Sequence, residues 1–182
     1  MSIRYAILGF LSWRPFTGYE LKKRFADALS FHWSGNNNQI YGTLVELHRE
    51  GAVSIEVQAQ EKLPARKVYT ITESGRRELK AWLLAESELP VLRSEFNTRL
   101  AWAGSLSRKE LWEIVEAYES QLAAQVMMYR ERARRGFSSP ERTPLEKRLW
   151  ESIDAHAIAF YEREAEWVGS LKAELGKEEE QP

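Results

Sequence analysis

Residues 36–58, NNNQIYGTLVELHREGAVSIEVQ, contain the change of pattern that decides the fold. The apolar positions of its first part recur at helical spacing: Ile40, Leu44 and Leu47. Gly51 then supplies a helix stop, and from residue 52 β-branched residues alternate with polar ones, as in a strand. A similar stretch covers 67–72, after a polar segment typical of a hairpin loop. The pattern therefore predicts a helix followed by a two-stranded ribbon.

Two further helices are predicted before this one. Apolar residues at helical spacing fill residues 3–11, and the Trp13-Arg-Pro15 sequence ends that pattern. Thr17 and Glu20 form a capping box that starts the next helix, and Asn36 is expected to cap the third. After the ribbon, Thr72 is expected to cap a helix that continues to residue 83. Three helices, a ribbon and a fourth helix are the elements of a winged helix-turn-helix.

The second half is predicted to be helical throughout. A short helical segment is expected over 91–103, and capping boxes at Ser107–Glu110 and Thr143–Glu146 each start a long helix. Both long helices carry heptad-like apolar positions. They are Leu111, Val115, Tyr118, Leu122, Val126 and Tyr129 in the first, and Leu145, Leu149, Ile153, His156, Phe160, Trp167 and Leu171 in the second. A two-helix hairpin covers only part of such a surface, so the remainder must meet the N-terminal domain or a second subunit. We expect a homodimer.

The predicted fold class is therefore mostly α (α+β), with an N-terminal winged helix-turn-helix and an all-helical C-terminal dimerisation domain. We place the first domain at 1–86, the second at 87–176 and a flexible acidic tail at 177–182. The N-terminal residues lack the pattern of a signal peptide, and no stretch approaches 18 uncharged apolar residues. We therefore expect a cytoplasmic protein without a membrane segment.

Composition and charge narrow the function. The 182 residues are 43% hydrophobic and 29% charged and include no Cys, so the chain should fold without disulfides or thiolate metal sites. Residues 1–80 hold 12 Lys and Arg against 8 Asp and Glu, whereas the remainder holds 14 against 19. The N-terminal half is thus the basic half, which weakly favours a polyanionic partner.

Catalytic motifs are missing from the sequence. We find no nucleophile elbow, Gly-rich phosphate loop or helical pair of metal-binding histidines. His32, His48 and His156 are dispersed, and histidines such as the last two, beside apolar stripes, are more often satisfied structural residues than ligands. We therefore expect no enzyme, no catalytic residues, no metal and no cofactor.

The predicted third helix has an unusual outward side. At 100° per residue, Leu44 and Leu47 fall within about 40° of Ile40, whereas a second group falls between about 100° and 200°. That group comprises Asn38, Tyr41, Gly42, Val45 and Arg49. Amides and a phenol near a helix N-terminus can donate to and accept from base edges, and a glycine allows close approach. The expected DNA base contacts are Asn37, Asn38, Gln39, Tyr41 and Gly42, although these asparagines could instead only cap the helix. The Tyr41 ring could instead lie against the second helix.

Cations around the ribbon tip are expected to contact DNA phosphates, together with a cation on the third helix. These residues are Arg49, Lys62, Arg66 and Lys67. By itself such a tip is an ordinary charged turn, and the prediction depends on its pairing with the third helix. Four tryptophans of the second half could line an effector pocket, although aromatic residues on helical seams more often belong to a core or an interface. They are Trp102, Trp112, Trp150 and Trp167.

Several segments together resemble the PadR family of transcriptional regulators. They are Ile7-Leu-Gly9, Thr17-Gly-Tyr-Glu-Leu21, Ile40-Tyr-Gly-Thr-Leu44, Glu50-Gly-Ala-Val53, and Pro64-Ala-Arg-Lys-Val-Tyr-Thr-Ile-Thr72 with Gly75. Phe31-His-Trp33, Gln39 and Arg93-x-Glu-Phe96 are similar to the AphA-like branch, which has a helical C-terminal domain. The resemblance implies a homodimeric regulator of transcription whose C-terminal helices interlock. The family often has Pro where this chain has Gly42.

We therefore expect a regulator, acting as a repressor, that binds a palindromic operator in double-stranded DNA as a homodimer. A small aromatic effector would release it, provided that it binds the DNA-competent and DNA-incompetent dimers with different affinity. The alternative is a winged-helix protein-interaction module without DNA binding. Salt-dependent retention on duplex DNA would separate the two hypotheses.

Overall fold

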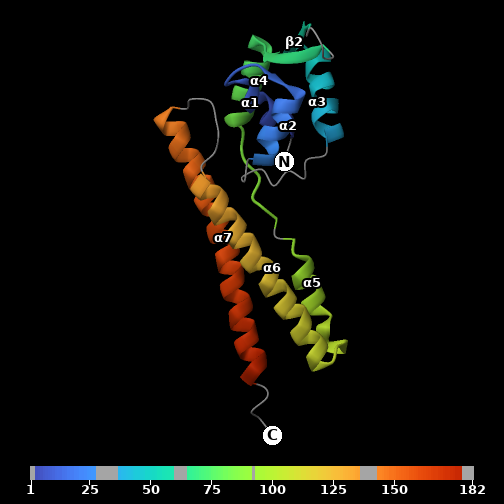
Figure 1. The fold of residues 1–182 in the computed structure, drawn as a ribbon, viewed down its shortest axis with the longest axis vertical. Helices are drawn as coiled ribbons and strands as arrows, with labels where there is room; N and C mark the ends of the chain where they lie inside the picture. The colour runs from blue at the N-terminus through green and yellow to red at the C-terminus, as the bar shows by residue number, and fades with distance from the viewer. Residues whose placement is uncertain (1–2, 28–36, 60–64, 92, 136–142, 178–182) are drawn as a thin grey trace. The chain divides into compact units, whose positions relative to one another are not determined.

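The computed structural model describes residues 3–27, 37–59, 65–91, 93–135 and 143–177, in two compact units, Met1–Glu88 and Leu89–Pro182 (Figure 1). The elements of the first are α1 (Ile3–Leu11), β1 (Phe16–Thr17), α2 (Gly18–Asp27), α3 (Asn37–Arg49), β2 (Val53–Gln58), β3 (Arg66–Ile71) and α4 (Glu73–Leu83). This is the predicted winged helix-turn-helix, with one additional strand.

Helix α3 packs its predicted apolar side into the core of the first unit. Ile40, Leu44 and Leu47 are completely buried, as expected from their spacing. Helices α1 and α2 both contact α3, and Phe10 of α1 packs edge-on against Phe25 of α2, with ring centroids 5.1 Å apart. One side of α3 is therefore committed to the core, which leaves the opposite side available.

The three strands form an antiparallel sheet in the order β1-β3-β2. Strands β2 and β3 pair from Val53↔Ile71 to Gln58↔Arg66, which makes the predicted ribbon. The short strand β1 adds to the other edge of β3, with Phe16 opposite Tyr69. A two-residue strand has no periodicity of its own, so its sequence did not predict it.

Local signals in the sequence end and start the helices. Glu20 accepts hydrogen bonds from the backbone N–H and the hydroxyl of Thr17, at 2.8 and 2.9 Å, which confirms the capping box of α2. Gly51 has a φ of 75°, and backbone bonds from Gly51 to His48 and from Ala52 to Leu47 complete a Schellman motif. The expected cap of α3, Asn36, lies outside the described residues.

The end of α3, the ribbon and α4 meet at one joint. The Thr72 hydroxyl donates to the Gly51 carbonyl at 2.7 Å and accepts from the Gly75 N–H at 3.2 Å, so it also caps α4 as predicted. A Cβ at Gly75 would lie 2.2 Å from the Ala52 carbonyl oxygen. Only glycine allows this approach of α4 to the start of β2.

An ion-pair cluster joins α1 to α4 and to the residue that follows α3. Arg4 of α1 donates through two guanidinium nitrogens to both carboxylate oxygens of Glu78 on α4, and it also contacts Glu50 after α3 at 2.6 Å. The side chains of Arg4 and Glu78 are 23% and 29% exposed. The hydrogen bonds from Arg4 hold the pKa of the Glu78 carboxyl below its usual value.

The second unit contains α5 (Glu95–Ala101), the 3₁₀ turn η2 (Ala103–Ser105), α6 (Arg108–Arg135) and α7 (Pro144–Lys177). Helices α6 and α7 lie side by side as an antiparallel hairpin (Figure 1). The predicted capping boxes at Ser107 and Thr143 are both formed. The expected segment 91–103 is helical only from residue 95, where Ser94 caps α5.

A small core holds the hairpin together. Phe96, Val115, Leu122 and Val168 are buried at its centre. Phe96 stacks on Tyr118, whose hydroxyl contacts Glu164 at 3.0 Å, and burial together with this hydrogen bond raises the pKa of Tyr118 to about 12. Among the described residues, no helix is long and apolar enough to span a membrane.

The Arg4 cluster predicts a specific pH dependence of stability. Because the pKa of Glu78 is depressed in the folded protein, its stabilising effect is present above about pH 4.5, and is lost as pH falls through the lower folded value. Glu78→Gln should lower the free energy of unfolding at pH 7 by about 1–2 kcal/mol. Urea titrations from pH 3 to 7, at one fixed protein concentration, would measure the difference.

That difference between wild type and variant should shrink as the carboxyl becomes protonated. Glu86→Gln, which changes an exposed acid beyond the end of α4, is the matched control and should change stability little at any pH. A constant difference between Glu78→Gln and wild type across the range would show that the ion pair does not stabilise the fold.

Candidate nucleic-acid interface

The outward side of α3 is exposed, as its sequence predicted. Asn38, Gln39 and Gly42 are exposed, Tyr41 is 46% exposed and Val45 is 63% exposed. A Cβ at Gly42 would meet nothing within 4 Å, so no internal contact explains a glycine there. Asn37 is the first residue of the helix. Asn38, Tyr41, Gly42 and Val45 therefore share one open surface, which we call the α3 surface, and Gln39 is exposed beside it.

The sequence left open whether Tyr41 faces outward or lies against the second helix, and in the structure it does both. Its ring is half-exposed on the α3 surface, yet its Cε1 atom would be 2.4 Å from a Cβ built on Gly18, the first residue of α2. The ring therefore contacts the second helix while part of it faces outward. Burial raises the pKa of Tyr69 on β3, and electrostatic repulsion from the nearby Tyr41 raises it further.

Cations lie at the end of the ribbon, as expected. Arg66 and Lys67 are exposed at the start of β3, and Arg66 Nε donates to Gln58 Oε1 at 3.0 Å across the ribbon. Arg49, at the end of α3, is also exposed and lies 3.9 Å from Glu50. Lys62 lies outside the described residues. The α3 surface and the ribbon cations belong to one unit, which is the arrangement in which a winged helix contacts bases and phosphates.

The described part of the chain holds no group of three or more His, Cys, Asp or Glu residues that could hold a metal ion. The His48 Nδ1 atom is 3.2 Å from the Val53 carbonyl, so this ring has a backbone partner, and His156 is exposed.

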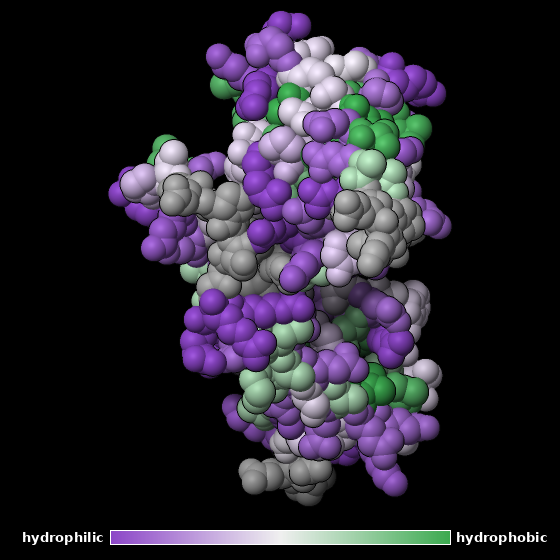
Figure 2. Space-filling view, turned by 45° about the horizontal axis from the view of Figure 1, so that its top comes forward, coloured by the Kyte–Doolittle hydropathy of each residue, from purple (hydrophilic) through white to green (hydrophobic). Residues whose placement is uncertain are grey.

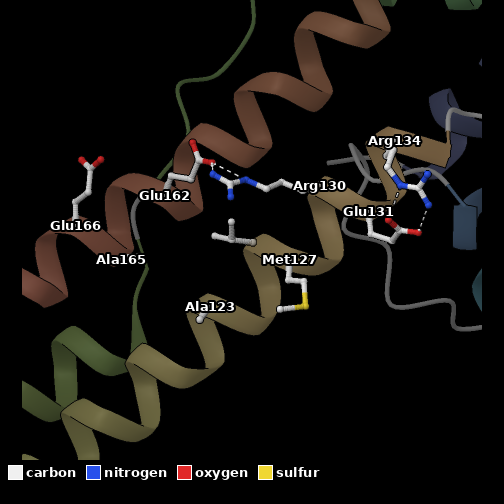
Figure 3. Close-up of a pocket in the computed structure, with 9 residues that line it drawn as sticks. Ala123, Met127, Arg130, Glu131, Arg134, Glu162, Ala165 and Glu166 are labelled. Carbon is white, nitrogen blue, oxygen red and sulfur yellow. Dashed lines mark hydrogen bonds and ion pairs between the residues drawn. The ribbon is translucent and has the colours of Figure 1, made fainter.

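Helices α6 and α7 border an open groove of about 860 Å³ in the second unit (Figure 3). Ala123, Val126, Met127 and Ala165 provide its apolar part. Two ion pairs lie at its rim, between Arg130 and Glu162 across the helices at 2.5 Å, and between Arg134 and Glu131 within α6 at 2.8 Å. These arginines are thus already paired with carboxylates in the isolated chain.

The four tryptophans proposed for an effector pocket occupy different parts of the second unit. Trp102 follows α5 and is 79% exposed. Trp112 lines a shallow groove with Arg108, Lys109 and Glu113, and Lys172 lies 5.4 Å from the centre of its ring. Trp150 and Trp167 are both on α7, and Trp167 packs edge-on against Phe96. Their role as an effector or dimer surface remains a prediction.

Most of the apolar seam predicted for α7 is uncovered in the single chain. Leu145, Leu149, Ile153 and Phe160 are each 45–59% exposed. The α7 residues that pack against the hairpin core are Leu171 of the predicted seam and, outside it, Tyr161, Ala165, Val168 and Leu175. Exposed hydrophobic surface is visible among the hydrophilic residues in Figure 2. We call Leu145, Leu149, Ile153, Phe160 and the 40%-exposed Trp167 the α7 stripe.

Two family matches cover most of the chain. Residues 7–81 match the transcriptional regulator PadR-like family, and residues 92–176 match the family described as virulence activator alpha C-term. The chain is 34% identical over 109 residues to the negative transcriptional regulator PadR of Bacillus subtilis. That match covers 59% of this chain and only 60% of the relative's own length.

Solved structures of related proteins match over nearly the whole chain. The crystal structure of Bacillus subtilis PadR in complex with operator DNA has a TM-score of 0.82 and 26% identity, and the match covers 95% of this chain and 98% of that one. PadR in complex with p-coumaric acid gives a TM-score of 0.77 at 26% identity, with 96% and 95% covered. The Vibrio cholerae virulence activator AphA gives 0.70 at 26% identity, with 97% and 99% covered.

Proposed function

The chain belongs to the PadR-like family of transcriptional regulators, and we propose that it is a repressor that binds a palindromic operator in double-stranded DNA as a homodimer. The observation that carries the proposal is the exposed α3 surface, rich in hydrogen-bonding side chains, on the same unit as the ribbon cations. The negative regulator PadR, crystallised with operator DNA, supports it.

Each part of the interface has a different proposed role. Asn37, Asn38, Gln39, Tyr41 and Gly42 are placed against base edges, where amide and phenol groups distinguish base pairs. Arg49, Lys62, Arg66 and Lys67 contact phosphates, which fixes the register of the protein without reading the sequence. In a two-fold symmetric dimer, half-sites one helical turn apart, about 34 Å, or a multiple of it would meet the two α3 surfaces.

We propose that the α7 stripe is the main dimer contact. It extends from residue 145 to residue 167, about 33 Å along the helix, and its members fall within an arc of about 80°. An apolar stripe of this length is more than a soluble monomer normally exposes. Aromatic residues bury about 150–250 Å² each, so two copies could form an interface of ordinary size.

The base and phosphate contacts predict different variant behaviour. Lys67→Ala should weaken operator and random duplexes alike, and should reduce the slope of log affinity against log salt by about one unit. Asn38→Ala should cost about 1–3 kcal/mol on the operator and little on random DNA. Fluorescence anisotropy at several KCl concentrations, on an operator selected from a random duplex library, would measure both.

Lys109→Ala is the matched control for charge, because this exposed cation lies in the second unit, and it should leave the salt slope unchanged. Melting of each variant would detect loss of fold. If the wild-type protein shows no salt-dependent retention on any duplex, DNA binding fails as its function and the protein-interaction alternative is favoured.

Assembly can be tested on the α7 stripe directly. Leu149→Glu and Ile153→Glu should each convert the dimer to a monomer at micromolar concentration, because a charge would have to be buried without a partner. Sedimentation velocity would measure the mass. Glu151→Ala, on the other side of the same helix, should leave the dimer intact, and a folded wild-type monomer at this concentration would contradict the proposal.

A small, flat, partly apolar effector is proposed to release the DNA. PadR of Bacillus subtilis, crystallised with p-coumaric acid, supports this chemical class. Phenolic acids should quench Trp fluorescence and lower operator affinity, and operator DNA should weaken effector binding by the same factor. Cyclohexanecarboxylate, a non-aromatic acid, should do neither. Equal operator affinity with and without saturating p-coumaric acid would exclude it as the effector.

A further inference from the structure

Gly18 provides the space that the Tyr41 ring occupies. A Cβ built on Gly18 would lie 2.4 Å from Tyr41 Cε1, 3.1 Å from Cζ and 3.2 Å from Cδ1. All three are atoms of one edge of the ring, so any residue larger than glycine at this position would have to displace it. Among the described glycines, Gly51 has a positive φ and Gly18 does not. The glycine at position 18 is therefore explained by the space it leaves and not by its backbone conformation.

A glycine at this position lowers the stability of the protein relative to an alanine. Gly18 is the first residue of α2, directly after the capping Thr17, and glycine weakens a helix relative to alanine. Gly9 in α1, by contrast, has nothing within 4 Å of its ideal Cβ. An alanine at position 18 would favour the helix but would collide with the ring of Tyr41.

The ring connects this contact to the proposed interface. Tyr41 is 46% exposed, and on the α3 surface it lies about one turn after Asn38 and one turn before Val45. Its contacts with α2 limit where its exposed edge and hydroxyl can be. The side chain is thereby pre-organised before any ligand arrives, which lowers the entropy lost on binding.

We infer that Gly18 is a positioning residue for DNA recognition: its missing side chain sets the place of the Tyr41 ring on the α3 surface. The inference rests on the proposed function, because it concerns the same interface. Gly18 itself need not touch DNA. Its effect on binding passes through Tyr41, and this makes the effect separable from a general effect on stability.

A double-mutant cycle tests this. Gly18→Ala should lower affinity for the selected operator about fivefold to tenfold, because one specific contact is displaced, and should leave random DNA nearly unchanged. Its melting temperature should be equal to or above that of the wild type, since the ring can move and alanine favours the helix. In the Tyr41→Ala background, Gly18→Ala should change operator affinity by about twofold or less. Gly9→Ala is the control glycine and should not alter DNA binding.

Three results would overturn the inference. The first is that Gly18→Ala binds the operator as tightly as the wild type. The second is that Gly18→Ala lowers operator affinity by the same factor in the Tyr41→Ala background as in the wild type. The third is that Gly18→Ala has a lower melting temperature than the wild type. The last would show that the backbone gives way instead of the ring.

A measurement on the unmodified protein is independent of all variants. A nuclear Overhauser contact between the Gly18 Hα and Tyr41 Hε protons is expected without DNA, and its absence would also overturn the inference. If the wild type binds no duplex, the proposed function fails, whereas this contact and the melting comparison still report on Gly18 and Tyr41.

Discussion

The joint between Gly51 and Gly75 is the constraint on which the first unit depends. A left-handed glycine, Gly51, ends α3, the ribbon begins two residues later at Val53, and the missing Cβ of Gly75 lets α4 approach the Ala52 carbonyl. The Thr72 hydroxyl and N–H both bond to this backbone, at 2.7 Å to Gly51 and 3.0 Å to Ala52. These contacts hold the end of α3, the start of the ribbon and α4 together, while burial of Ile40, Leu44 and Leu47 leaves the α3 surface facing outward.

Features with a local physical cause were predictable from the sequence. Capping boxes at Thr17, Ser107 and Thr143 depend on residues three apart, and the buried side of α3 depends only on a 3.6-residue period. Gly51 signalled the end of α3 for the same reason. Strand β1 could not be predicted in this way, because it is a strand only through its pairing with β3.

The parts of the candidate site that depend on local sequence patterns were also predictable. Helical periodicity identified the outward residues of α3, and the ribbon pattern placed Arg66 and Lys67 near its tip. The position of the Tyr41 ring was beyond that reasoning, because it depends on Gly18, which is 23 residues away in sequence and on another helix. A glycine directly after a capping threonine was the one available signal. For α7, periodicity detected an apolar seam but could not tell which of its residues α6 covers.

The rigid joint has a consequence for the nucleic acid. Because hydrogen bonds join the end of α3 to the start of the ribbon, separate movement of these two parts on a duplex would have to break them. A DNA that contacts both must therefore supply the required offset between its grooves by its own bending and twisting. The energy of that deformation depends on base steps that the protein does not touch, with pyrimidine–purine steps the easiest to distort. Under the proposed function, flexibility of the operator would thus be a second determinant of sequence preference.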